Sequence, residues 1–229
     1  VSSGATSNDA TIALTFTTSE STTGFTANDV TVSGGSISNF AGSGTDYTAT
    51  LTPSADGLTT TSVNQGAFSD SAGNSNTASN SFLWTYDGTS PTVQITTSAS
   101  NPATGSTIAV TITFSEATTN FASSDVTVGG GSVTAFSGSS STVYVATITP
   151  SADGTVTVDV ASGVATDAVG NANTAATQFS IESDQADAPA FTSSTSGATS
   201  ATEDSAYSYT ATASDADDGT PHSNSITLS

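Results

Sequence analysis

The sequence contains neither lysine nor arginine, although it has 20 acidic residues, so its formal net charge is −20 at pH 7. Its carboxylates therefore have no lysine or arginine of the same chain with which to form an ion pair. Two carboxylates about 4 Å apart repel each other by roughly 4 kcal/mol at an effective dielectric constant of about 20. Acidic side chains that cluster in the fold must consequently bind cations, take up protons or be held apart.

The missing positive charge and the missing cysteine exclude several classes of partner and site. Nothing in the chain would neutralise phosphates, so nucleic acid is not an expected partner. Anionic membrane surfaces are disfavoured for the same reason. Membrane insertion is not expected either, because no apolar stretch approaches the roughly 20 residues that span a bilayer. Without cysteine there are no disulfide bonds and no thiolate metal ligands.

Features of an enzyme are also scarce. The only histidine, His222, lies in the polar stretch DDGTPHSNS, where we expect an exposed loop. A Ser-His-Asp arrangement needs a histidine beside its nucleophile, and the chain has no second one. The glycine triplet at 129–131 falls between two predicted strands and favours a hairpin turn, whereas a phosphate-binding loop would join a strand to a helix. We therefore expect no enzymatic activity.

Hydrophobic residues make up only 34% of the chain, but they are regularly spaced. In one stretch Tyr144, Ala146 and Ile148 alternate with threonines, and this period of two is typical of half-buried β-strands. Clusters of Gly, Pro, Asn and Asp separate such runs and indicate turns. The pattern predicts an all-β protein.

The sequence also repeats itself. TIALTFTTSESTTGFTANDVTVSGGSISNF, which starts at Thr11, aligns with TIAVTITFSEATTNFASSDVTVGGGSVTAF, which starts at Thr107. After a one-residue insertion, YTATLTPSADG from Tyr47 aligns with YVATITPSADG from Tyr144. Two modules of about 96 residues are therefore predicted.

In the second module we expect seven strands, at 92–97, 107–115, 125–129, 131–137, 142–149, 155–161 and 177–182. This number of short strands predicts tandem immunoglobulin-like Greek-key β-sandwiches in a linear array. The counterpart of 91–97 would precede Val1, so we expect the first module to lack its first strand and the chain to be part of a longer protein. The predicted domains are 1–87, 88–184 and a partial module at 185–229.

Apolar positions in these strands predict the two cores. The second core is expected to hold Ile108, Val110, Ile112, Val126, Val128, Tyr144, Ile148, Val158, Val160, Phe179 and Ile181. The first is expected to hold Ile12, Leu14, Phe16, Val30, Val32, Tyr47, Leu51, Val63, Phe82 and Trp84. Because Thr59 and Thr61 replace valines of the second module, we expect the first module to be less stable.

Acidic residues fall where Greek-key topology brings loops and linkers together. Glu116 ends the second strand of the second module, Asp167 precedes its seventh strand, and Asp87 lies in the incoming linker. We expect these three to converge, whereas Asp56 and Asp153 are better explained as turn residues. At the next junction the candidates are Asp184, Asp187, Asp215 and Asp217. Calcium takes six to eight oxygen ligands, so the sequence predicts Ca²⁺ sites at both junctions.

Three motifs carry a resemblance to a known family: FSEATTNFASSDVTV (114–128), TPSADGTVTV (149–158) and TDAVGNANT (166–174). Together with their counterparts in the first module, they resemble the bacterial Ig-like repeats of large surface adhesins over residues 1–187. DQADAPAF (184–191) and SDADDG (214–219) are similar to the calcium-binding motifs of cadherin-like repeats, so the resemblance implies calcium ligands at Asp184, Asp187, Asp215 and Asp217. Such families imply rigid rods outside the cell.

The expected function is a structural repeat segment of an extracellular bacterial adhesin or matrix fibre, stiffened by calcium and located at the cell surface. Its expected partners are the neighbouring modules of the same chain, with other copies in a fibre and cell-surface or matrix glycans as further candidates. One alternative is a filament subunit joined by strand exchange at an open sheet edge. Another is a carbohydrate-binding module of a secreted protein, which would need exposed aromatic side chains.

Overall fold

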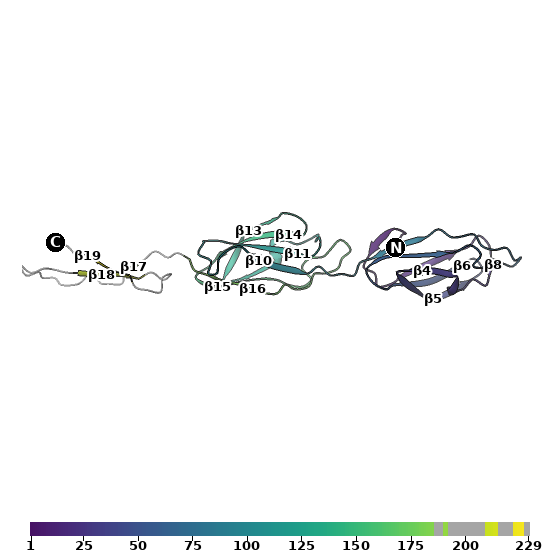
Figure 1. Cartoon of the computed structure of the whole chain (residues 1–229), viewed down its shortest axis with the longest axis horizontal. Helices are drawn as coiled ribbons and strands as arrows, with labels where there is room; N and C mark the ends of the chain where they lie inside the picture. Colours follow the sequence, from purple (N-terminus) through teal and green to yellow (C-terminus); the bar gives the residue numbers. More distant parts are fainter. Residues whose placement is uncertain (186–189, 192–208, 215–221, 227–229) are drawn as a thin grey trace, which may run out of the picture. The chain divides into compact units, whose positions relative to one another are not determined.

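The computed structural model describes residues 1–185, 190–191, 209–214 and 222–226. This part of the chain forms β-strands, joined by loops and by two short 3-10 helices, η1 (Ala27–Asp29) and η2 (Ser123–Asp125) (Figure 1). The all-β prediction is therefore confirmed. No helix among these residues has the length and apolar character needed to cross a membrane.

The chain divides into two compact units that do not coincide with the two repeats. The first unit holds residues 1–92 together with 114–121 and 162–174, which are two loops of the second repeat. The second unit holds 93–113, 122–161 and the residues from 175 onward. The linker and the two loops that carry Asp87, Glu116 and Asp167 thus belong to one unit.

The first repeat contains two main sheets. One has the strand order β1-β9-β7-β4, with β1 Ala5–Ser7, β9 Phe82–Tyr86, β7 Gly57–Val63 and β4 Val30–Ser33. The other has the order β2-β6-β5, with β2 Ile12–Thr17, β6 Asp46–Pro53 and β5 Gly35–Ser43. A short pair joins β3 (Thr22–Thr23) to β8 (Ser69–Asp70). β1 runs parallel to β9, and the other pairs are antiparallel.

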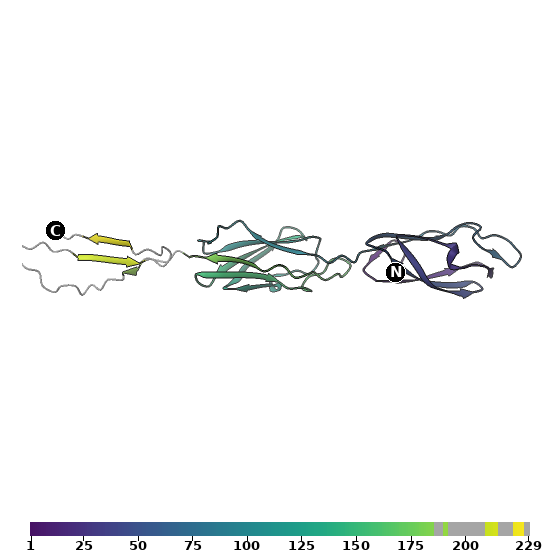
Figure 2. The ribbon, with the colours of Figure 1, turned by 60° about the horizontal axis from the view of Figure 1, so that its bottom comes forward.

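The second repeat has the same two-sheet design (Figure 2), but the sheet that corresponds to β2-β6-β5 has one more strand and the sheet that corresponds to β1-β9-β7-β4 has one fewer. That sheet has the order β10-β11-β14-β13, with β10 Val93–Thr97, β11 Ile108–Phe114, β14 Val143–Pro150 and β13 Gly131–Gly138. The other sheet has the order β12-β15-β16, with β12 Val126–Gly129, β15 Gly154–Val160 and β16 Phe179–Ser183. All seven predicted strands are present, with boundaries within two residues of those expected.

Two local predictions were wrong. The glycine triplet at 129–131 does not form a hairpin turn, because β12 and β13 belong to different sheets. Gly130 has φ +72°, and a Cβ there would lie 2.4 Å from the Thr155 carbonyl oxygen, so the crossing requires glycine. His222 lies in a strand rather than in a loop: β19 (His222–Ile226) pairs with β18 (Tyr209–Ser214), which also pairs with β17 (Ala190–Phe191).

Alternation places the apolar residues in the two cores. Ile108, Val110, Ile112 and Ile148 are fully buried in the second repeat, and Trp84 and Leu51 are fully buried in the first. Most other predicted core residues are also buried; Phe16, Val32, Phe82, Val128 and Phe179 are only half-buried.

The first core contains polar groups at two positions where the second repeat has valine. Thr59 is buried and donates a hydrogen bond from Oγ1 to the Trp84 carbonyl oxygen at 2.8 Å. Thr61 is equally buried, but its Oγ1 has no hydrogen-bond partner. An unpartnered buried hydroxyl costs about 1–3 kcal/mol, a cost that Val158 avoids at the equivalent position.

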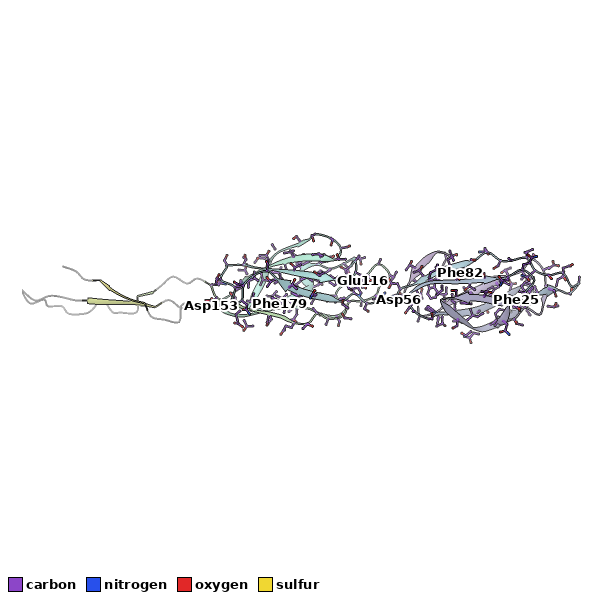
Figure 3. The ribbon with its side chains drawn as sticks, viewed as in Figure 1. Phe25, Asp56, Phe82, Glu116, Asp153 and Phe179 are labelled. Atoms are coloured by element: carbon purple, nitrogen blue, oxygen red, sulfur yellow. The ribbon has the colours of Figure 1, made fainter. Side chains whose placement is uncertain are left out.

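Aromatic rings fill one end of the first repeat. Phe25, labelled in Figure 3, packs edge-on against Tyr47 at a centroid distance of 4.9 Å and against Phe40 at 5.2 Å. Phe16 and Phe68 contact the same ring. Phe16 of β2, the strand at which the smaller sheet ends, packs against this cluster.

Candidate cation site at the linker

Three carboxylates from separate segments meet in the first unit. Asp87 follows β9 in the linker, Glu116 follows β11, and Asp167 lies in the loop 162–174. One carboxylate oxygen of each lies within 4.8 Å of the other two. Asp167 is 5% exposed and the other two are half-buried, so little water screens their mutual repulsion.

The loop that contains Asp167 wraps around the Asp167 carboxylate and donates hydrogen bonds to it. Oδ1 of Asp167 accepts hydrogen bonds from the backbone N–H groups of Val169 (2.9 Å), Gly170 (2.7 Å) and Asn171 (2.8 Å). Oδ2 accepts the Asn171 side-chain amide at 2.8 Å. Burial acts to raise the pKa of Asp167, but these hydrogen bonds, led by those of Asn171, outweigh it and lower the pKa below 3.8. Asp167 is therefore an anion at neutral pH.

The linker is held by hydrogen bonds on two sides. Asp56 accepts the Gly88 N–H at 2.8 Å and also the Thr89 hydroxyl. The hydrogen bond from Thr89, and to a smaller extent that from Gly88, lowers the pKa of Asp56. On the other side, Asn171 Nδ2 donates to the carbonyl oxygen of Asp87 at 2.9 Å. The backbone around Asp87 is thus fixed without any metal.

Glu116 is the carboxylate whose interactions are incomplete. Its Oε1 is buried and has no hydrogen-bond partner. Burial, followed by the negative charges of Asp167, Asp87 and Asp56, raises the pKa of Glu116 above its usual 4.5. Figure 3 labels Glu116 and Asp56, whose charge raises the pKa of Glu116 least of the three. A buried, unpaired anionic oxygen is unfavourable unless a proton or a cation neutralises it.

The donor set fits a hard cation. It offers only carboxylate oxygens, which are the ligands that calcium prefers, and it includes one buried oxygen that lacks a partner. Asp87, Glu116 and Asp167 would hold the ion, with water completing the six to eight oxygen ligands. Nitrogen and sulfur ligands, which zinc and copper favour, do not belong to this cluster.

The first repeat provides an internal comparison. Asp70 and Asn74 correspond to Asp167 and Asn171, and Asp70 Oδ1 accepts the N–H groups of Ala72 and Asn74 at 2.8 Å each. Glu20, which corresponds to Glu116, is exposed. The folded loop therefore occurs in both repeats. A half-buried glutamate that lies beside two aspartates occurs, among the residues described, only at Asp87, Glu116 and Asp167.

The second predicted site is only partly visible. Asp187, Asp215 and Asp217 lie outside the described residues. Asp184 is half-buried, and its N–H donates to the Ala103 carbonyl oxygen at 2.9 Å. Calcium binding at this junction stays a prediction.

Sequence reasoning missed the hydrogen bonds that hold the linker segments. Asp56 was assigned to a turn, but it accepts the N–H of the residue 32 positions later, and Asp153 does the same for Gln185 at 2.7 Å. The identical spacing, in both repeats, between the PSADG turn and the linker that follows it was the available signal. No sequence pattern indicates that Asn171 bonds to the Asp87 carbonyl oxygen.

The two sandwiches and their shared loop design define a tandem Ig-type protein. Residues 1–86 and 87–183 each match the family described as bacterial Ig-like domain, and the chain belongs to this family. The resemblance inferred from the repeat motifs is therefore confirmed.

Solved structures show more distant similarity. The Escherichia coli adhesin FdeC is 17% identical, with a TM-score of 0.43; the match covers 80% of this chain and 62% of that one. A chimeric titin Z1Z2 that carries a KLER peptide from decorin is 11% identical, with a TM-score of 0.21 and coverages of 79% and 90%. No curated protein sequence matches this chain.

Proposed function

We propose that this chain is a non-enzymatic structural repeat segment of an extracellular bacterial adhesin or matrix fibre, and that Ca²⁺ bound by Asp87, Glu116 and Asp167 stiffens its linker. Membership of the bacterial Ig-like family and the tandem repeat support the structural role. The three clustered carboxylates support the role of calcium.

The buried, unpartnered Oε1 of Glu116 carries the proposal. Two unit charges 4.8 Å apart repel by about 3.5 kcal/mol at an effective dielectric constant of 20, and the cluster contains three such pairs. The chain has no lysine or arginine to offset this repulsion. A divalent cation would replace the repulsion with attraction and give the unpartnered oxygen a ligand bond.

The position of the cluster connects calcium to stiffness. Asp56 and Asn171 already hold the linker backbone at Gly88 and Asp87. An ion shared by Asp87, Glu116 and Asp167 would add a third restraint, which joins the linker to both loops of the second repeat. Extracellular modules bind calcium at roughly 0.1–1 mM, so such a restraint suits a protein outside the cell.

Partners follow from this role: neighbouring repeats of the same chain, and other copies where a fibre forms. The structure gives no support to the carbohydrate-binding alternative. Among the described residues, the large hydrophobic side chains that are exposed are Val1, Leu58 and Leu83, and none of them is aromatic.

Calorimetric titration with calcium tests the proposal. We expect one site with a dissociation constant of roughly 0.1–1 mM, and weaker binding of magnesium, which demands a tighter octahedral shell. Glu116→Gln should abolish the site, whereas Glu20→Gln, the matched change in the first repeat, should leave it intact. Small-angle scattering with calcium and then with chelator would measure the stiffness. Identical titrations of the two variants would show that the cluster holds no ion.

A further inference from the structure

The outer face of the sheet β1-β9-β7-β4 carries no charged side chain. The acidic residues of the first repeat lie in loops, in η1, in the linker or in strands β6 and β8, and none lies in these four strands. The positions of the four strands that point away from the core hold only threonine, serine and leucine. In a chain with a net charge of −20, this face is an uncharged surface.

Two exposed leucines lie on the central strands of this face. Leu58 of β7 is 56% exposed, and Leu83 of β9 is 37% exposed. Leu58 lies opposite Thr85, so Leu83, two residues away on the same strand, is its diagonal neighbour at about 7–8 Å. The two leucine side chains therefore form one apolar patch with hydroxyl side chains around it.

The second repeat does not share this surface. Two hydroxyl residues replace the leucines and two acids replace hydroxyl residues: Thr155 for Leu58, Ser180 for Leu83, Asp159 for Ser62 and Glu182 for Thr85. Thr155 and Ser180 are exposed in that repeat, where β10 is present, so exposure at these positions does not depend on where the other sheet ends. The shared fold therefore requires no leucine at either position.

Charge decides which partner suits the uncharged face. Two copies of a chain that lacks lysine and arginine repel each other wherever their carboxylates come close, so they can meet only through surfaces that have none. A hydroxyl both donates and accepts hydrogen bonds, so a surface of threonine and serine is complementary to itself. A basic partner would find no carboxylate on this face to pair with.

We propose that the outer face of β1-β9-β7-β4 pairs with the same face of a second copy of this chain, around a two-fold axis that brings Leu58 and Leu83 of both copies together. Four strands spaced about 4.8 Å apart and roughly six residues long cover about 400 Å². A typical stable interface buries about 800 Å² per partner, so a single pair is weak. The contact joins chains side by side, and its role rests on the fibre proposed above.

Sedimentation equilibrium of the full chain in chelator tests the pairing. We expect a monomer–dimer equilibrium with a dissociation constant of roughly 0.1–1 mM, as the small area implies. Association should be tighter at about 0.5 M than at about 0.05 M NaCl, because salt screens the repulsion between the two chains. Since chelator removes calcium, the result does not depend on the site at Asp87. A chain that stays monomeric at about 1 mM in the higher salt overturns the proposal.

Three variants locate the contact. The double variant Leu58→Thr, Leu83→Ser takes the residues of the second repeat and should raise the dissociation constant at least about ten-fold, because the apolar contact is lost. Ser62→Asp should also weaken pairing, and less so at high salt, since it adds a carboxylate to the face. Thr48→Asp is the matched control, because Thr48 is exposed on β6 of the other sheet.

Trp84 fluorescence reports that the first repeat of each variant stays folded. Dimers that persist unchanged in the leucine and Ser62 variants overturn the proposal, as does an equal loss of pairing in the Ser62 and Thr48 variants, because either result would place the contact on another surface. So does saturable binding of a neutral oligosaccharide, maltohexaose, to a monomeric chain with amide shifts centred on Leu58 and Leu83. A glycan would then occupy the face in place of a second copy.

Discussion

Asn171 ties the linker to the acidic loop: its Nδ2 donates to the Asp87 carbonyl oxygen at 2.9 Å and to Asp167 Oδ2 at 2.8 Å. In the first repeat, Asn74 makes only the second of these contacts, to Asp70 at 2.7 Å. One side-chain amide thus fixes two of the three clustered acids relative to each other. The contact is a supporting interaction of the kind that orients metal ligands in other proteins.

Asn171→Ala should weaken calcium binding by roughly 10-fold or more, the usual effect of removing a group that orients ligands. Asn74→Ala is the matched control, because it removes the same loop contact without touching the linker. Calorimetric titration of both variants measures the difference. Equal affinities would show that the bond to Asp87 does not organise the site.

Asp56→Ala should release the linker backbone at Gly88. Because a single hydrogen bond contributes about 0.5–1.5 kcal/mol, hydrogen exchange of the Gly88 amide should accelerate roughly 2- to 10-fold. Asp153→Ala should accelerate only Gln185, whose N–H donates to Asp153 in the same way. Unchanged exchange at Gly88 in the Asp56 variant would mean that the contact does not restrain the linker in solution.

Glu116 and Asp167 give opposite pH dependences in the calcium-free chain. The pKa of Glu116 is raised above 4.5, so its contribution to stability is fully present below pH 4.5 and is lost as the pH rises through its folded pKa. The pKa of Asp167 is lowered below 3.8, so its contribution is present above pH 3.8 and is lost as the pH falls through its folded pKa. In chelator, acidification from neutral pH toward 4.5 should therefore raise the melting temperature, and further acidification should lower it.

Glu116→Gln isolates the first half of this dependence. The variant should lose the rise in melting temperature between neutral pH and 4.5, because glutamine does not titrate. In the unsubstituted chain with calcium, acidification in the same range should instead weaken calcium binding, since protons compete for the Glu116 carboxylate. A rise that persists in the variant would assign the effect to another group.

Much of the fold follows from period-two alternation and from the internal repeat. The strand at 143–150 alternates between buried and half-buried side chains along its whole length, as its sequence predicts. Greek-key connectivity also explains why Glu116 and Asp167, about 50 residues apart, reach one place. The details that were missed depend on tertiary placement: no local pattern shows that Asn171 reaches the Asp87 carbonyl or that β12 and β13 join different sheets.

Thr61→Val should stabilise the first repeat. Thr61 is buried, and its Oγ1 has no hydrogen-bond partner, so valine removes the desolvation cost of a hydroxyl at nearly constant volume. Val158 occupies the equivalent position in the second repeat and is fully buried. A gain of about 1 kcal/mol corresponds to a rise of roughly 4–8 °C in the melting temperature of a domain of this size.

The matched control is Thr59→Val, which also introduces a valine that the second repeat already has. Thr59 donates to the Trp84 carbonyl oxygen at 2.8 Å, so its loss removes a real hydrogen bond and should give no gain. Trp84, the only tryptophan, is fully buried in this repeat, and its fluorescence therefore reports the unfolding of the first repeat alone. If both variants shift the transition equally, the Thr61 hydroxyl finds a partner in solution, and the first repeat does not carry the cost assigned to it.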